Sequence, residues 1–109
     1  MPDIRLSPSA MRKLESIRRY FVEELGSLAT SESTVERILK DITILENNPE
    51  VGPRLSSRTD SIPLRFKDTR FLVCHDYIAI YDSNPEGIEV LMIYHSRENV
   101  FSRFLIEID

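Results

Sequence analysis

Hydrophobic residues recur in the first third of the chain at spacings of three and four, the period of an α-helix. The first such stripe consists of Met11, Leu14, Ile17, Phe21 and Leu25. Charged residues fill most of the positions between them, so only one face is apolar. Ser7 and Pro8 supply an N-terminal cap and a first helical position, and Gly26 is a natural stop. The pattern predicts an amphipathic helix, preceded by a short strand over residues 3–7, where polar and apolar residues alternate.

A second helical stripe follows, made of Val35, Ile38, Leu39, Ile42 and Leu45. The run from Ser33 to Glu36 has the form of a capping box, with Thr30 and Ser31 as alternative caps slightly earlier. Pro49 disfavours helix at the residue before it, so the second helix should end near Asn47. Two amphipathic helices with a short connection form an antiparallel hairpin, and their apolar faces need a sheet to cover them.

The second half of the chain has the signals of strands and turns. Residues 51–61 are loop-like, and residues 62–66 alternate around Pro63, which suits an edge strand or an extended arm. Three stronger strands are expected at residues 70–74, 77–82 and 88–95, with connections short enough for an antiparallel meander. Residues 99–106 suit a last short helix or turn. These elements predict one α+β domain over residues 1–109, a helical hairpin packed on a curled antiparallel sheet, with a site on the opposite face of the sheet.

Composition narrows the class of protein. The chain has 109 residues and a formal net charge of −4, which disfavours a strongly basic nucleic-acid binder. Residues 54–70 depart from that balance, with five cations against two acids. The apolar runs are far shorter than the roughly 20 residues of a membrane span, and no secretory leader follows Met1. With a lone cysteine, Cys74, these features make the cytoplasm the expected location.

A few side chains are candidates for chemistry. Cleavage of RNA through its 2′-hydroxyl needs proton transfer and cations near the phosphate. His95 and Arg97 are two apart at the end of an expected strand, which places them on one face, and a structural hydrogen-bonding histidine is the alternative. Two histidines and one cysteine form no metal-ligand motif, no phosphate-binding glycine motif is present, and no cofactor is expected. Cys74 is expected in the core, facing away from His75.

Five segments, in this order and at these spacings, resemble toxins of the RelE/ParE superfamily, which act in bacterial type II toxin–antitoxin and plasmid stabilisation systems. They are residues 4–10, 48–52, 70–73, 76–81 and 94–99. The resemblance covers essentially the whole chain. It implies a growth-inhibiting protein neutralised by an antitoxin encoded beside it, whose tail covers the groove between the sheet and the helical hairpin. The residues expected to contact a partner are Arg65, Lys67, Tyr77, Tyr81 and Tyr94.

The resemblance leaves three functions open. RelE-like members cleave messenger RNA on the ribosome, and this reading assigns catalysis to His95, Arg97 and Arg70. ParE-like members bind a protein target, DNA gyrase. A non-toxic homologue would keep only antitoxin binding. Ile78 and Phe101 stand where RelE-like nucleases commonly have an arginine and a tyrosine, and this departure, with the negative charge, favours the ParE-like branch.

Overall fold

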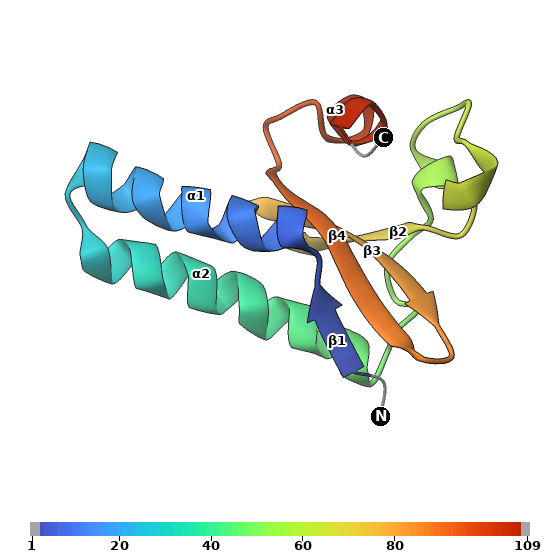
Figure 1. Cartoon of the computed structure of the whole chain (residues 1–109), viewed down its shortest axis with the longest axis horizontal. Coiled ribbons are helices and arrows are strands. Elements are labelled where there is room, and N and C mark those ends of the chain that lie inside the picture. The colour runs from blue at the N-terminus through green and yellow to red at the C-terminus, as the bar shows by residue number, and fades with distance from the viewer. Residues whose placement is uncertain (1–2, 108–109) are drawn as a thin grey trace.

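A computed structural model describes residues 3–107 as an α+β arrangement (Figure 1). The strands and helices, in chain order, are β1 (Asp3–Leu6), α1 (Pro8–Leu25), α2 (Leu28–Ile42), β2 (Arg70–Cys74), β3 (Tyr77–Asn84), β4 (Gly87–His95) and α3 (Val100–Glu107). Single 3-10 turns occupy Thr43–Glu46, Leu55–Ser57 and Leu64–Phe66. The prediction that the chain begins without a leader concerns, in part, Met1 and Pro2. These two residues lie outside the described part of the chain.

The ends of α1 follow the sequence prediction. The Ser7 hydroxyl accepts a 3.0 Å hydrogen bond from the backbone N–H of Ala10, and Pro8 occupies the first turn. At the other end Gly26 has a φ of 62°, and the N–H groups of Gly26 and Ser27 bond to the last carbonyls of the helix. This is a Schellman motif, which glycine forms without steric cost.

The predicted start of α2 is wrong by several residues. The cap is Ser27, whose hydroxyl accepts a 3.1 Å bond from the N–H of Thr30. Neither the Ser33 to Glu36 box nor Thr30 or Ser31 begins the helix. Ser31 is instead buried inside α2, and its hydroxyl donates to the carbonyl of Arg18 at 2.9 Å. The two helices are therefore joined by two residues, Gly26 and Ser27.

The four strands form one mixed sheet in the order β1-β4-β3-β2. β2, β3 and β4 are the antiparallel meander that the short turns predict. β1 pairs in parallel with β4, from Asp3 opposite Gly87 to Leu6 opposite Val90. The helical hairpin and the meander bring β1 beside β4, the last strand in the chain. Local sequence patterns do not predict this pairing, because the two strands are about 80 residues apart.

Residues 62–66 do not form the predicted edge strand. After Pro63 the chain makes a 3-10 turn, in which Phe66 is buried while Leu64 is 80% exposed. At the edge of the sheet next to β2, residues 53–55 form a short bridge around Arg54 and Arg70, with backbone hydrogen bonds from Phe71 to Pro53 and from Leu55 to Thr69. The alternation of apolar and polar residues over 62–66 therefore reflects a turn, in which the Phe66 side chain enters the core.

Both faces of the sheet pack against other elements, and the face opposite the hairpin, on which the sequence placed a site, carries a second core. One face packs on the hairpin through a core that includes Leu14, Ile17, Ile38, Ala79 and Ile93. The other face packs on α3 and on the segment before β2 through a second core that includes Leu55, Phe66, Phe71, Ile80 and Phe104. The α3 segment and the loop fill the space in which a site was expected.

The hairpin extends well beyond the sheet at one end (Figure 1). Not all of the predicted apolar stripe is buried: Leu14 and Ile17 are in the core, whereas Met11 and Leu25 are each 57% exposed. Within residues 3–107 no helix is long and apolar enough to cross a membrane. In the same range no three His, Cys, Asp or Glu side chains gather as metal ligands would.

Candidate functional site

The last residues of β4 bring His95 against Tyr77 of β3. The two residues are register partners, and their rings meet edge to face with centroids 5.1 Å apart. Both are partly buried. Burial, followed by the nearby carboxylate of Asp76, raises the pKa of the Tyr77 hydroxyl, which therefore stays protonated at neutral pH.

The turn after β4 uses His95 as an acceptor. The backbone N–H of Arg97 donates to Nδ1 of His95 at 3.1 Å, and the N–H of His95 donates to the Glu98 carboxylate at 2.8 Å. When the imidazole is neutral, its proton is therefore on Nε2. β4 ends at His95, so the alternation that would place Arg97 on the same face stops there, and Arg97 is exposed in the turn.

A cleft of about 540 Å³ lies between α1 and this end of the sheet. Tyr77, His95 and Glu98 line one wall. The other wall is one flank of α1, formed by Lys13, Ser16, Ile17, Tyr20, Phe21 and Leu25. Lys13 lies 3.7 Å from the Glu98 carboxylate across the mouth of the cleft. The lining is mainly aromatic and aliphatic, with one ion pair, which suits an apolar anchor of a partner better than a phosphate.

Arg70 lies elsewhere. It is at the start of β2, opposite Tyr81, whereas His95 pairs with Tyr77, four residues away along β3. This separation is about 13 Å at the rise of a strand. The Arg70 guanidinium donates to the carbonyls of Glu50 and Gly52 at 3.0 and 2.7 Å. The three predicted catalytic residues therefore do not form one cluster.

The predicted partner-binding residues divide into exposed and buried ones. Arg65 and Lys67 are exposed around the 3-10 turn, and the Arg65 guanidinium lies 4.7 Å above the ring of Phe66. Tyr81 and Tyr94 are 0% and 1% exposed. Tyr81 faces the core beneath the hairpin and Tyr94 faces the second core, although Tyr94 also lines a shallow pocket beside Lys13 and Glu107. Tyr77 is the tyrosine of the three that lines the cleft beside His95.

The buried tyrosines have internal partners. The Tyr94 hydroxyl donates to the Glu107 carboxylate at 2.6 Å and connects β4 to α3. Burial first, and this hydrogen bond second, raise the pKa of Tyr94 well above its usual range, while the same bond lowers the pKa of Glu107. A hydroxyl that donates to a carboxylate favours its own protonated form and the ionised form of the acid. The two pKa values therefore shift in opposite directions.

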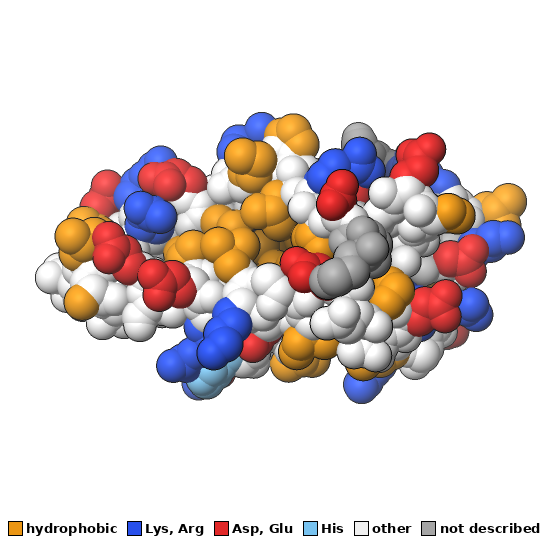
Figure 2. All heavy atoms as spheres, turned by 90° about the horizontal axis from the view of Figure 1, so that it is seen from below, with side chains coloured by type: hydrophobic (Ala, Val, Ile, Leu, Met, Phe, Trp, Pro, Cys, Tyr) orange, Lys and Arg blue, Asp and Glu red, His pale blue; other side chains and the backbone are white. Residues whose placement is uncertain are grey.

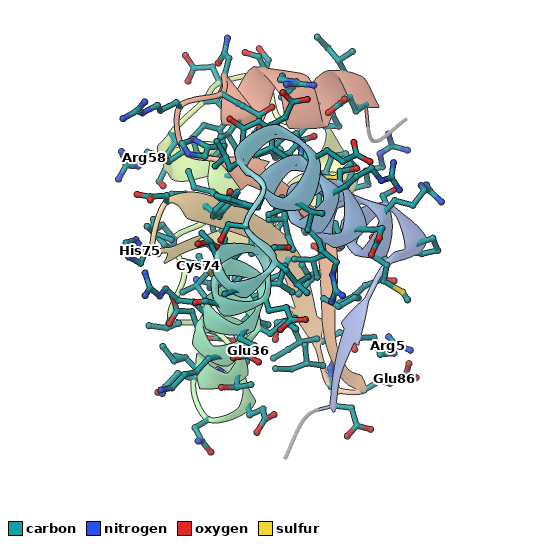
Figure 3. All side chains as sticks on the ribbon, turned by 90° about the vertical axis from the view of Figure 1, so that its left-hand side faces the viewer. Arg5, Glu36, Arg58, Cys74, His75 and Glu86 are labelled. Carbon is teal, nitrogen blue, oxygen red and sulfur yellow. The ribbon has the colours of Figure 1, made fainter. Side chains whose placement is uncertain are left out.

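Cys74 lies in the core, as predicted, whereas His75 beside it is exposed near α2 (Figure 3). Cys74 is completely buried in the core beneath the hairpin, and burial raises its pKa to about 12. A thiol with this pKa is not a nucleophile at neutral pH. His75 is exposed in the two-residue turn between β2 and β3, where its φ of 61° is unusual for a residue with a Cβ.

Comparison with known proteins decides the family. The model of the family described as "ParE toxin of type II toxin-antitoxin system, parDE" matches residues 4–100. The chain belongs to the ParE toxin family. This places it in the RelE/ParE superfamily, as the sequence predicts. No curated protein sequence matches the chain.

A solved structure supports the fold assignment. It is described as the chromosomal ParDE TA system from P. aeruginosa, and it superposes with a TM-score of 0.63. The sequences are 16% identical, and the match covers 87% of this chain and 96% of the other. At that identity the similarity establishes a common fold.

Two positions at which this ParE-family chain departs from the nuclease pattern have packing roles. Ile78 and Phe101 contribute to the second core, and the ring of Phe101 meets that of Phe71 edge to face at 5.1 Å. Neither side chain has a group that exchanges a proton or binds a phosphate. The sequence prediction missed Lys13, Tyr20 and Glu98 as cleft residues. Tyr20 lies three residues after Ile17, so it is on the same flank of α1. This spacing could have indicated that Tyr20 lines the cleft.

Proposed function

We propose that this protein is a ParE-like toxin that inhibits growth by binding a protein target, DNA gyrase, and that an antitoxin encoded beside it neutralises it. The observation that carries the proposal is the match to the ParE toxin family over residues 4–100. The antitoxin is proposed to bind with apolar anchors beside the sheet, where the cleft along α1 offers Tyr20, Phe21 and Tyr77.

The positions of the candidate catalytic groups support a binding mechanism. Arg70 is engaged with two backbone carbonyls, about 13 Å along the sheet from the row of His95. Ile78 and Phe101 are packed among apolar side chains. A nuclease needs a base, an acid and a phosphate-binding cation around one reacting group, and these residues do not surround one point.

An endoribonuclease is the second candidate, and one observation favours it. The cleft contains five groups able to transfer or stabilise a proton: Lys13, Tyr20, Tyr77, His95 and Glu98. Such a cluster is a common feature of catalytic sites. The raised pKa of Tyr77 makes its hydroxyl an acid and not a base at neutral pH, so a general base would have to be the Glu98 carboxylate, or His95 after it gives up the bond that Nδ1 accepts from Arg97.

One expression experiment separates these functions. The protein is induced alone and together with the neighbouring reading frame, while growth, message integrity and DNA supercoiling are followed. Growth arrest with gyrase-linked DNA damage, relieved by the neighbour, is the expected result. Codon-specific message cuts before any DNA damage would select the nuclease, and unimpaired growth would select a non-toxic homologue that retains antitoxin binding.

A further inference from the structure

The tip of the hairpin, residues 20–36, leaves apolar side chains without a cover. Tyr20, Val22, Leu25 and Leu28 are 54%, 39%, 57% and 57% exposed. They come from the last turns of α1 and the first residue of α2, on either side of the Gly26 and Ser27 connection. Exposed apolar residues concentrated in one place mark interaction surfaces more often than scattered ones do.

The same tip carries charge of one sign. From Tyr20 to Glu36 there are four acids, Glu23, Glu24, Glu32 and Glu36, and no lysine or arginine. All four are exposed. Arg18, Arg19 and Arg37 border the segment, and Arg18 lies 3.9 Å from Glu15 in its own helix. Figure 2 shows acidic and hydrophobic side chains together at the left end of the molecule, the end at which the tip lies in Figure 1.

Two of these acids oppose the stability of α1. Glu23 and Glu24 are in its last turn, where the carbonyl ends of the helix carry partial negative charge and cations are favoured. No basic residue occupies that turn. Glu24 also follows Phe21 by three residues and Tyr20 by four, so it shares the face of α1 that lines the cleft. Glutamates that destabilise the end of α1 are consistent with a surface whose negative charge serves to bind a partner.

We infer that the hairpin tip is a docking surface for a basic amphipathic helix of a partner protein. The apolar side chains of that helix would cover Leu25 and Leu28 and reach the cleft beside Tyr20, while its lysines and arginines would face Glu23, Glu24 and Glu32. A nucleic acid is excluded because its phosphates would meet the same carboxylates. A second copy of this chain is disfavoured because two acidic tips would repel each other. The inference does not depend on the cellular target proposed above, and the helix would compete with the proposed antitoxin for the cleft beside Tyr20.

Synthetic helices test the charge requirement. The first probe is an 18-residue peptide with leucines on one face and lysines elsewhere; the second has glutamate in place of lysine, and the third has serine in place of leucine. We expect the first alone to bind the whole protein, with NMR shift changes confined to residues 20–36 and the cleft. Equal binding of the glutamate or serine peptide, or shift changes centred elsewhere, would overturn the inference.

Variants give the test two readouts of opposite sign. Glu23→Gln with Glu24→Gln should weaken binding of the lysine peptide about threefold to twentyfold, the effect of two exposed charges. The same variant should raise the thermal midpoint of the free protein, because the unfavourable charges at the end of α1 are removed. Glu86→Gln, in the turn at the far end of the sheet (Figure 3), is the matched control and should change neither value. Loss of affinity in Glu86→Gln equal to that in the tip variant would show non-specific attraction.

A second pair of variants tests the apolar part. Leu25→Ser with Leu28→Ser should abolish binding of the lysine peptide, whereas Leu64→Ser, at a residue that is 80% exposed outside the tip, should not. Sedimentation of the unmodified protein completes the test. We expect a monomer, and a dimer that dissociates in the Leu25→Ser, Leu28→Ser variant would identify the tip as a contact between copies and overturn the inference.

Discussion

The hydroxyl of Tyr81 accepts a 3.0 Å hydrogen bond from the backbone N–H of Gly52, 29 residues earlier in the chain. Arg70, the register partner of Tyr81, holds the same loop from the other side through the carbonyls of Glu50 and Gly52. Three of the segments that carry the family resemblance thus meet at one point. Their shared role is to fix the loop after the hairpin against the sheet, which gives these residues a structural role.

Tyr81→Phe should destabilise the fold by about 1 to 3 kcal/mol, because the substitution leaves the buried N–H of Gly52 without an acceptor. Urea unfolding measures the loss. Tyr20→Phe is the control, since Tyr20 is 54% exposed and should change stability by less than about 0.5 kcal/mol. Equal, small effects of the two substitutions would mean that water replaces the hydroxyl.

The two glycines of the connections should respond differently to alanine. A Cβ on Gly52 would lie 2.1 Å from the carbonyl oxygen of Phe71, a contact with backbone that cannot move easily. A Cβ on Gly26 would meet nothing within 4 Å, and the strain there comes only from its φ of 62°. We expect Gly26→Ala to lose about 1 kcal/mol and Gly52→Ala to lose more than about 3 kcal/mol or fail to fold. A smaller loss at Gly52 than at Gly26 would contradict the close approach of the loop to β2.

Local patterns predicted the elements whose causes are local. Ser7, Pro8 and Gly26 act within one helical turn, so both ends of α1 could be read from the sequence. The start of α2 could not, because the choice of Ser27 depends on how the Schellman motif directs the chain into the next helix. The parallel pairing of β1 with β4 and the turn around Phe66 depend on contacts between distant segments, for which periodicity contains no information.

The candidate site was harder to predict than the fold. The expectation that His95 and Arg97 share a face assumed that the strand continues, but it ends at His95. The grouping of Arg70 with His95 followed from residue type, whereas the register of the meander places their partners, Tyr81 and Tyr77, four residues apart on β3. Lys13 and Glu98 face each other only because α1 crosses the end of the sheet, so no spacing in the sequence connects them.

The core beneath the hairpin should be sensitive to truncation. Leu14→Ala and Ile38→Ala should each lose about 2 to 5 kcal/mol, the effect of removing a packed aliphatic side chain. Met11→Ala provides an internal control on the same helix, because Met11 is 57% exposed although it belongs to the predicted stripe. Chemical unfolding of the three variants checks the order. A loss at Met11 as large as that at Leu14 would show that α1 is rotated about its axis relative to this structure.

Stability should fall in mild alkali because of Cys74. Burial, with a smaller contribution from the Asp41 carboxylate, raises its pKa from 9.0 to about 12. Above pH 9 the unfolded chain releases the thiol proton while the folded chain retains it, so rising pH favours unfolding. The loss should reach about 1 kcal/mol at pH 10. Unfolding free energies at pH 8 and pH 10 check it, and the difference should shrink in Cys74→Ala. An unchanged difference in that variant would assign the effect to the buried tyrosines.

His95→Asn separates the structural role of this residue from a catalytic one. The amide oxygen of asparagine takes nearly the position of Nδ1, so the N–H of Arg97 keeps an acceptor, whereas no group remains to exchange a proton near neutral pH. If His95 were a general acid or base, RNA cleavage would fall by about 10²- to 10⁴-fold. We expect instead that the unmodified protein makes no cuts in message on translating ribosomes and that toxicity survives in His95→Asn, because a toxin that binds its target needs the shape of the turn after β4.

His95→Ala is the companion variant: it removes the acceptor as well, and it should lower stability more than His95→Asn does. Primer extension on message from translating ribosomes decides the question, since codon-specific cuts by the unmodified protein that disappear in His95→Asn would restore the endoribonuclease function.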